Sequence, residues 1–268
     1  YAELHYRFKY FGSLYYQKEP EILADAPYRL EPNKSLPILL LIKDAHIFPI
    51  HLYYVSVHIY QNGEKIYKDD IKYDQIIKNR WWDKTIYIDT DNINGNINLN
   101  IYYYYSVNGV KKHCVTHNFP QSNIHTLYCN ISKYHYPKDL NVQYGDLHYH
   151  TNLTEDMVEY GAPIRATLIA AESMGLDFFC NTDHSYDLDD KYDSWTETDP
   201  DLRKWHDSRK EIDNINNENI FSSFIIPSEE LTLHNNKRQN VHALILNNSK
   251  FLPGAGDGGS RSDCQRIC

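Results

Sequence analysis

Apolar and polar residues follow different patterns in the two halves of this 268-residue chain. Up to about residue 137, short apolar runs and alternating stretches rich in β-branched and aromatic residues predict strands, with no helical period. We expect strands at residues 36–42, 50–60, 85–88, 97–106 and 115–119. Asn62-Gly63 and Asn108-Gly109 are strong signals for two-residue hairpin turns. The first half therefore predicts an antiparallel β-sandwich of immunoglobulin-like size.

The second half alternates between strand and helix patterns. A strand-like stretch ends near His150, and a helical pattern follows that begins at Pro163 and ends at Gly175. Its apolar residues recur at i, i+4 and i+7: Ile164, Leu168 and Ala171. Later elements are a buried strand at residues 176–180, a helix beginning at Asp199-Pro200, and strands at residues 221–226 and 241–246. This alternation is typical of an α/β fold with a parallel sheet.

Residues suited to binding metal ions lie where these strands begin or end. His148 and His150 are two positions apart, so in a strand they project to the same face. His184 follows the next strand, Glu230 follows the strand after it, and His242 lies near the start of the last one. Active sites of parallel α/β folds lie at the carboxyl ends of the strands. Imidazole and carboxylate groups at that edge are suitable ligands for a divalent ion.

These residues occur in motifs that resemble the PHP (polymerase and histidinol phosphatase) family of metal-dependent phosphoesterases. In family order the motifs are Gly-Asp-Leu-His-Tyr-His-Thr from Gly145, Thr-Asp-His from Thr182, the strand with Ser228 and Glu230, and Val-His-Ala-Leu from Val241. Ser228 stands where the family usually has Gly. The resemblance covers roughly residues 141–258 and implies a distorted (β/α)₇ TIM-like barrel.

Some branches of this family carry a β-sandwich ahead of the catalytic domain. We therefore expect a β-sandwich domain at residues 1–137, the N-terminal part of a PHP domain at residues 138–258, and an atypical tail at residues 259–268. The composition of the tail favours a frameshifted or artificial end, and a genuine terminus is the alternative. Because the chain begins with Tyr1 rather than Met, we also expect that its natural start is missing.

The resemblance further implies a set of metal ligands. They are His148, His150, Glu155 or Asp156, His184, Glu230 and His242. His148 and His150 would share one ion with Glu230, Glu230 would bridge to a second ion that takes His242, and the acid at 155 or 156 would hold a third with His184. Asp183 would orient an imidazole. Up to three Mn, Zn or Fe ions would activate a water for hydrolysis.

The expected barrel is incomplete. The family normally supplies a further His or Cys and a late Asp-x-His, and no residue after His242 matches them. Each metal position would then be one ligand short. We expect a fragment of an enzyme, whose activity alone is doubtful.

Each motif has a structural interpretation when it is taken alone. A His-x-His pair is usually two half-exposed histidines, and Glu229-Glu230 is usually a solvated charge pair; only the four motifs together favour a metal site. Trp81-Trp82 is interpreted as a core anchor or interdomain contact rather than a sugar platform. We interpret four other histidines as surface residues: His113, His117, His206 and His234.

Charge and composition narrow the functional classes. The net charge of −9 and pI near 5.8 argue against nucleic-acid binding, and no run of 18 apolar residues predicts a membrane span. Five cysteines at irregular spacing form no disulfide framework, which favours a cytoplasmic location.

We expect a metal-dependent phosphoesterase that acts on a small phosphorylated substrate. The alternatives are a metal-dependent hydrolase of another ester or of a carbamate, and a β-sandwich binding protein with an inactive PHP scaffold. A nuclease or proofreading module would need a basic groove that the sequence does not predict.

Overall fold

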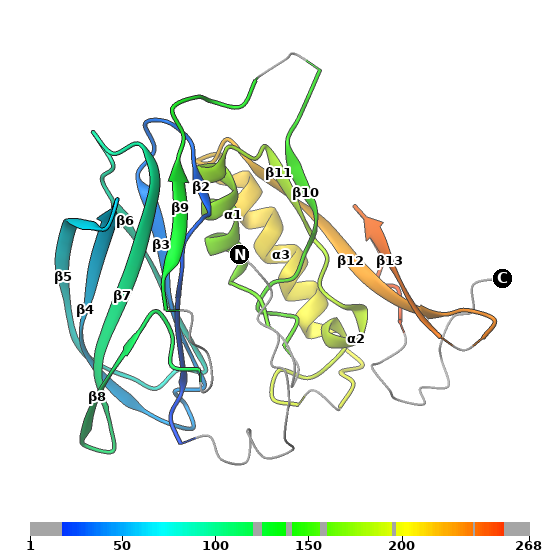
Figure 1. The fold of residues 1–268 in the computed structure, drawn as a ribbon. Coiled ribbons are helices and arrows are strands. Elements are labelled where there is room, and N and C mark those ends of the chain that lie inside the picture. Colours follow the sequence, from blue (N-terminus) through cyan, green and yellow to red (C-terminus); the bar gives the residue numbers. More distant parts are fainter. Residues whose placement is uncertain are drawn as a thin grey trace. The chain divides into compact units, whose positions relative to one another are not determined.

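The described chain divides into two compact units, one made mostly of residues 9–137 and the other mostly of residues 138–268. The computed structural model describes residues 18–119, 125–137, 141–155, 160–194, 197–237 and 239–254. Figure 1 shows that the first unit consists of strands and that the helices lie in the second.

The first unit contains nine strands in its described residues. They are β1 (Glu21–Asp25), β2 (Arg29–Leu30), β3 (Leu36–Lys43), β4 (Ile50–Gln61), β5 (Glu64–Ile77), β6 (Trp81–Ile88), β7 (Gly95–Val107), β8 (Val110–Val115) and β9 (Leu127–Ile131). A three-stranded sheet has the order β1-β3-β6, and a second sheet has the order β2-β9-β7-β4-β5 with β8 paired to β7. Only the short β2–β9 pair is parallel.

One hydrophobic core joins the two sheets of the first unit. Leu52, Val57 and Ile59 of β4 point into it together with Ile101 of β7 and Ile38 of β3. The alternation of apolar and polar residues along β7 explains why one side of that strand is buried and the other is not. In contrast, β3 is buried along its whole length, as expected for an uninterrupted apolar run.

The two predicted hairpin turns are confirmed. β4 joins β5 at Asn62-Gly63, and β7 joins β8 at Asn108-Gly109. All four residues have positive φ angles, as a type I′ turn requires. The strand predicted at residues 115–119 is wrong, because β8 ends at Val115 and Thr116 has a φ of 62°.

The second unit has four strands and three helices in its described residues. They are β10 (Gly145–Tyr149), α1 (Ile164–Met174), β11 (Phe178–Asn181), α2 (Ser185–Leu188), α3 (Arg203–Asn217), β12 (Phe224–His234) and β13 (Asn240–Leu246). The sheet has the order β10-β11-β12-β13. The first three strands are parallel, and β13 is antiparallel to β12.

A second core joins α1 and α3 to this sheet. Ile164 and Leu168 of α1 and Ile212 of α3 pack with Phe179 of β11 and Ile225 of β12. The predicted helix after Pro163 is confirmed, and Gly175 follows it with a φ of 88°, a conformation that glycine adopts without strain.

The start predicted for the next helix is wrong by a few residues. α3 begins at Arg203, after Leu202 in a left-handed conformation. Asp199 does not cap it; its carboxylate accepts hydrogen bonds from Arg203 Nε at 2.5 Å and from the Asp201 amide at 3.1 Å.

The expected immunoglobulin-like sandwich followed by a partial (β/α)₇ barrel is not the fold of this chain. The described residues are mostly strand, and only α1, α2 and α3 are helical, with α2 a single turn of four residues. A barrel of that type needs a helix after each strand and parallel neighbours throughout. Here β12 connects to β13 through a short turn, and the two strands are antiparallel.

Candidate metal centre

Two imidazoles meet at the end of β10. His148 and His150 are two residues apart, and their Nε2 atoms lie 3.2 Å from each other. Both nitrogens also approach the same oxygen of Glu230, Oε2, at 2.9 Å from His148 and 2.7 Å from His150. The structure therefore brings these two histidines together with an acid from β12, some eighty positions later in the sequence.

Glu230 also contacts two further imidazoles. Nδ1 of His242 lies 2.6 Å from Glu230 Oε1, and Nδ1 of His184 lies 3.4 Å from Oε2. Two groups of possible ligands thus share one carboxylate. They are His148, His150 and Glu230, and His184, Glu230 and His242; within each group the ligand atoms lie within 4.8 Å of one another.

Parallel pairing of the strands brings three of these residues to one edge of the sheet. Just beyond the paired parts of β10 and β11, the Thr182 amide donates to the Tyr149 carbonyl at 2.9 Å. On the other side of β11, the Glu230 amide donates to the Asp183 carbonyl at 3.0 Å, and residues 184 and 230 form a parallel bridge. His242 arrives by a different route, since β13 places it opposite Thr232, on the same face as Glu230.

The environment of Glu230 keeps it ionised. Burial alone would raise its pKa, but hydrogen bonds from His150 and His148 and the charge of His184 lower the pKa to about 2. The side chain of Glu230 is only 4% exposed, whereas those of His148 and His242 are 47% and 41% exposed. A small molecule can therefore reach the imidazoles of His148 and His242 while the carboxylate stays shielded.

Asp183 holds together the two loops that carry the ligands. It is fully buried. Its Oδ1 accepts hydrogen bonds from the amides of Thr151 (2.6 Å) and Thr154 (3.3 Å) and from the Thr154 hydroxyl (3.0 Å). Its Oδ2 accepts from the Thr151 hydroxyl at 2.7 Å and from Asn181 Nδ2 at 2.9 Å. In the described part of the chain these hydrogen bonds come from threonines and an asparagine, rather than from the imidazole that the resemblance implies.

The other acids near the motifs include Glu155 and Asp156, the two predicted as alternative ligands. Glu155 is half-buried, pairs with Tyr160 in a single β-bridge, and belongs to neither ligand group. Asp156 lies outside the described residues. Asp146 is exposed, and its side chain accepts a hydrogen bond from the His148 amide at 3.0 Å. This bond fixes the backbone at His148, one of the proposed ligands.

Sequence reasoning missed three residues that shape the centre. Thr151 and Thr154 anchor the loop after His150, and the Thr154 hydroxyl also accepts from the His184 amide at 3.1 Å. Tyr186 stacks on the His184 ring, with ring centroids 4.7 Å apart and planes inclined by 16°. Thr151 and Thr154 follow His150 closely in the sequence, and that position is the one signal that could have identified them.

Glu229, next to the shared carboxylate, faces the opposite side of β12. It is fully buried, with Arg209 Nη2 at 4.0 Å and a hydrogen bond from Asn248. Burial raises the pKa of Glu229 to about 7, although the charge of Arg209 and hydrogen bonds from the Leu252 backbone, Asn248 and Trp205 oppose this rise. The interpretation of Glu229-Glu230 taken alone, a solvated charge pair, is therefore wrong, because both acids are buried and have separate partners.

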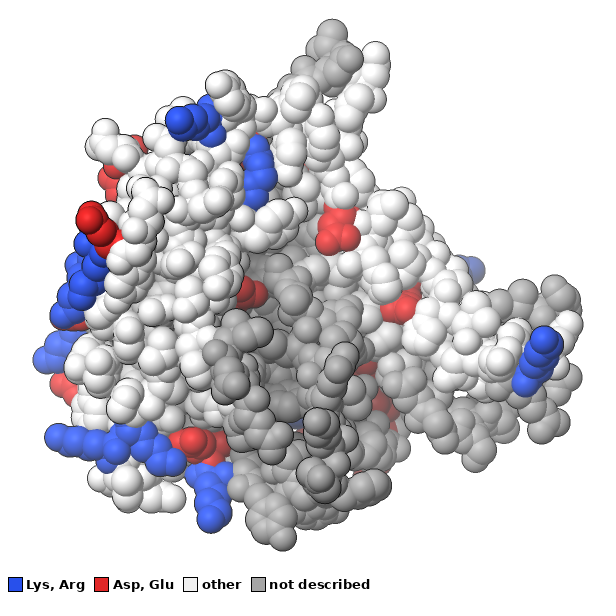
Figure 2. Space-filling model, in the orientation of Figure 1, with Lys and Arg blue, Asp and Glu red and all other residues white. Residues whose placement is uncertain are grey.

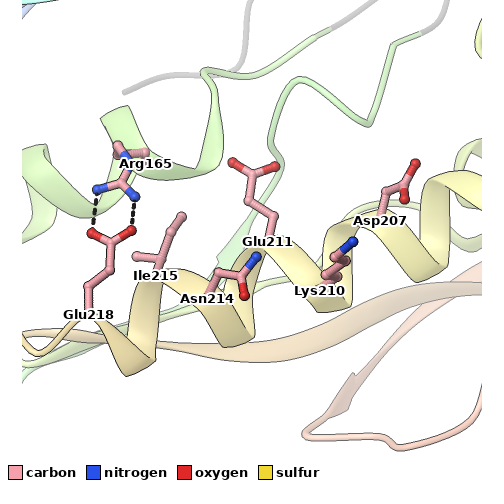
Figure 3. A pocket seen from close by; sticks show the side chains of 7 residues that line it. All are labelled: Arg165, Asp207, Lys210, Glu211, Asn214, Ile215 and Glu218. Atoms are coloured by element: carbon pink, nitrogen blue, oxygen red, sulfur yellow. Dashed lines mark hydrogen bonds and ion pairs between the residues drawn. The ribbon is translucent and has the colours of Figure 1, made fainter.

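A surface hollow of about 310 Å³ lies elsewhere in this unit (Figure 3). Arg165 of α1 donates two hydrogen bonds to Glu218 there, and α3 contributes its charged face. The residues that line the hollow include no histidine. We interpret it as a solvated helix surface rather than a reactive site.

The other candidates from the sequence have structural contacts. Trp82 packs against the core of the first unit and edge-on to Tyr73, and Lys43 lies over the ring of Trp81. His113 and His206 are exposed. His117 was expected at the surface but is only 9% exposed, because it stacks on Phe119 and packs beside His125.

The donor set suits a divalent transition metal. Ligand atoms about 2 Å from one ion lie about 3 Å from one another. The contacts among His148, His150 and Glu230 span 2.7 to 3.2 Å, so these three atoms have the spacing of a coordination shell. Imidazole nitrogen with carboxylate oxygen is a ligand set that zinc, iron and manganese accept.

No family model matches the chain, and no curated protein matches it. None of the helices in the described residues is long and apolar enough to cross a membrane.

Proposed function

We propose that this chain is a metal-dependent hydrolase that cleaves a phosphoester in a small phosphorylated substrate. One observation carries the proposal: four imidazoles from β10, β13 and two strand ends converge on the single buried carboxylate of Glu230. Buried charged groups in proteins are usually paired or bind metal ions, and four imidazoles around one carboxylate form a typical set of metal ligands.

Each ligand group could hold one ion. His148, His150 and Glu230 would hold one, and His184 and His242 would hold a second that shares Glu230. When bound, such ions supply Lewis acidity toward a phosphoryl oxygen and a lowered pKa for a water molecule.

The chain's own residues contribute the positioning. Glu230 is ionised throughout the physiological pH range because its pKa is about 2. Asp183 anchors the loop that follows His150 through the amides of Thr151 and Thr154. The Thr154 hydroxyl in turn accepts a hydrogen bond from the His184 amide. The half-exposed His148 and His242 present the centre to solvent, where a substrate phosphate would arrive.

The choice of a phosphoester rests on two further points. The motifs around His148, His184, Glu230 and His242 resemble those of PHP phosphoesterases. In addition, on the face that Figure 2 presents, Lys and Arg lie singly or beside acids, without a continuous basic surface among the residues shown in colour. Together with the net charge of −9, this favours a small substrate over a nucleic acid.

Metal content of the purified chain tests the proposal. We expect near-stoichiometric Mn, Zn or Fe after metal-free purification and reloading, and at least a tenfold loss in His148→Ala/His150→Ala. The control is His113→Ala/His206→Ala, which removes two exposed histidines and should bind metal like the parent chain. Folding of each variant is checked by circular dichroism.

Activity then separates the reaction classes. The loaded chain should release phosphate from aryl and alkyl phosphates and should leave carboxyl esters and carbamates intact. Hydrolysis of esters without phosphatase activity would reject the phosphoester assignment. Absence of metal from the folded parent chain would reject the metal-dependent mechanism.

A further inference from the structure

The larger sheet of the first unit has one face in the core and one face turned away from it. Along β4, Val55, Val57 and Ile59 point into the core, so the residues that alternate with them lie on the outer face. Residues directly opposite one another in neighbouring strands share a face, which extends this outer face over β5, β7 and β9. We call it the tyrosine face after five of its tyrosines: Tyr54 and Tyr60 of β4, Tyr102 and Tyr104 of β7, and Tyr128 of β9.

At one end of the tyrosine face the rings stack on one another across the strands. Tyr54 stacks on Tyr104, with ring centroids 4.3 Å apart and planes inclined by 15°. His113 of β8 flanks Tyr104 on its other side, at 6.1 Å and 22°. Because these rings cover one another, this part of the surface offers a partner mainly ring edges and hydroxyl groups.

At the other end of the tyrosine face a ring is open and lies among amides. Tyr128 is 65% exposed. Asn98 of β7 stands between it and Tyr60, directly opposite both. Beside this row, Asn130 Nδ2 donates to Asn96 Oδ1 at 2.7 Å. An open phenol ring can cover the apolar face of a sugar ring, and the neighbouring amides can donate to and accept from the sugar hydroxyls.

The charge of the tyrosine face is opposite to that of the whole chain. Strand register and ion pairs place six charged side chains on it: Lys65, Lys68, Lys72, Lys111, Asp70 and Asp74. Four lysines and two aspartates give +2, in a chain of net charge −9. Lys68 pairs with Asp70 at 2.7 Å, whereas Lys65 has no ion-pair partner among the described residues, and Lys72 is 80% exposed. Charge complementarity therefore favours an anionic partner.

The spacing of the charges and the packing of the rings decide which polyanion fits. Lys68 and Lys72 are four residues apart along β5, about 13 Å, whereas duplex DNA carries one charge per 1.7 Å or so. Single-stranded nucleic acid binds by stacking successive bases on open aromatic rings, and the rings of Tyr54 and Tyr104 cover each other. A chain of sugars with one carboxylate on each ring has sparse charge and many hydroxyls, which matches this surface.

We propose that the tyrosine face binds an acidic polysaccharide built of uronic acid residues. Tyr128 stacks on one sugar ring, and Asn98 and the tyrosine hydroxyls form hydrogen bonds with sugar hydroxyls. Lys65, opposite Tyr60, and Lys72, opposite Tyr54, pair with carboxylates at the two ends of the face. This binding does not depend on the metal centre or on the proposed hydrolysis.

Calorimetry with defined oligosaccharides tests this proposal on the full chain. The probes are hexagalacturonate, its complete methyl ester, which has the same sugars without the charge, and a thymidine heptanucleotide, which has the same number of negative charges. We expect hexagalacturonate to bind about tenfold more tightly than either of the other two. Equal affinity for the methyl ester, or equal or tighter binding of the heptanucleotide, would overturn the proposal; the latter would make the face a nucleic-acid site.

Matched variants assign the binding to the tyrosine face. Tyr128→Ala and Lys65→Gln/Lys72→Gln should each lower the affinity for hexagalacturonate by about tenfold, and their unfolding midpoints should match that of the parent chain. The controls lie outside this face: Tyr87→Ala removes an exposed tyrosine from β6 in the smaller sheet, and Lys78→Gln/Lys84→Gln removes two exposed lysines. Both controls should bind like the parent chain. No binding by the parent chain, or full affinity in both Tyr128→Ala and Lys65→Gln/Lys72→Gln, would also overturn the proposal.

Discussion

Replacing Asp183 separates a positioning role from a ligand role. This buried carboxylate accepts five hydrogen bonds, two of them from the backbone amides of Thr151 and Thr154. In Asp183→Ala the two threonine hydroxyls can rotate toward other acceptors, but the two amides cannot. Each stranded buried donor costs about 1–3 kcal/mol, so we expect a loss of about 2–6 kcal/mol. That is a large share of the total stability of a typical domain, about 5–15 kcal/mol.

The conservative variant should cost much less. Asp183→Asn keeps one oxygen for the amides of Thr151 and Thr154, and places its NH₂ group toward the Thr151 hydroxyl and Asn181. The hydroxyl can accept instead of donating, and the Asn181 amide can flip to present its oxygen. The remaining loss is the charge assistance of these hydrogen bonds, about 1 kcal/mol.

Urea denaturation followed by circular dichroism measures these differences, and hydrogen exchange of the Thr151 and Thr154 amides localises them. Asp146→Ala is the matched control, because Asp146 is exposed and accepts a single hydrogen bond, and its loss should be below about 1 kcal/mol. An Asp183→Ala variant as stable as the parent would refute the reasoning. A variant of normal stability that fails to bind metal would instead make Asp183 a ligand.

Three further substitutions test other parts of the structure. Glu230→Gln should lower metal affinity by at least a hundredfold at both ligand groups, measured by competition with a chelating dye, whereas Glu211→Gln on the exposed face of α3 should leave it unchanged. The pKa of Glu229 is raised from 4.5 to about 7 in the folded state, so below pH 4.5 this acid is protonated in both the folded and the unfolded state. The free energy of unfolding should therefore fall as the pH rises from about 4.5 to 7. Denaturation of metal-free Glu229→Gln should lack this dependence on pH. Tyr103→Phe should destabilise the first unit by about 1 kcal/mol, because the Tyr103 hydroxyl donates to the Leu23 carbonyl at 2.7 Å in the core; no change in its unfolding midpoint would contradict this.

Local signals in the sequence predicted the elements better than the long-range arrangement. Asn62-Gly63 and Asn108-Gly109 specify their turns because few residues adopt two successive positive φ angles. Pro163 and Gly175 bracket α1 for similarly local reasons. β5, however, was not predicted as a strand; it is dominated by charged residues, and it forms because β4 supplies a full row of hydrogen-bond partners. Pairing with a neighbour overrides a weak intrinsic preference.

The candidate centre shows the same limit. The i, i+2 spacing of His148 and His150 indicates a shared face, but no local rule brings them to Glu230. That step depends on the order β10-β11-β12, which a sequence pattern does not specify uniquely. Asp183 illustrates the reverse difficulty: its place in a His-rich motif suggested an imidazole partner, and the loop geometry gives it threonines instead.

The error over the barrel has a definite cause in the connection between β12 and β13. Only residues 235–239 separate the two strands, and a parallel crossover needs a dozen residues or more. The sequence pattern predicts that this strand ends at residue 226, which leaves room for a crossover, whereas β12 continues to His234. The hairpin also has a chemical consequence. Its antiparallel register places His242 opposite Thr232, on the same face of the sheet as Glu230, without a crossover connection. The centre is thus assembled from the ends of three parallel strands and one hairpin.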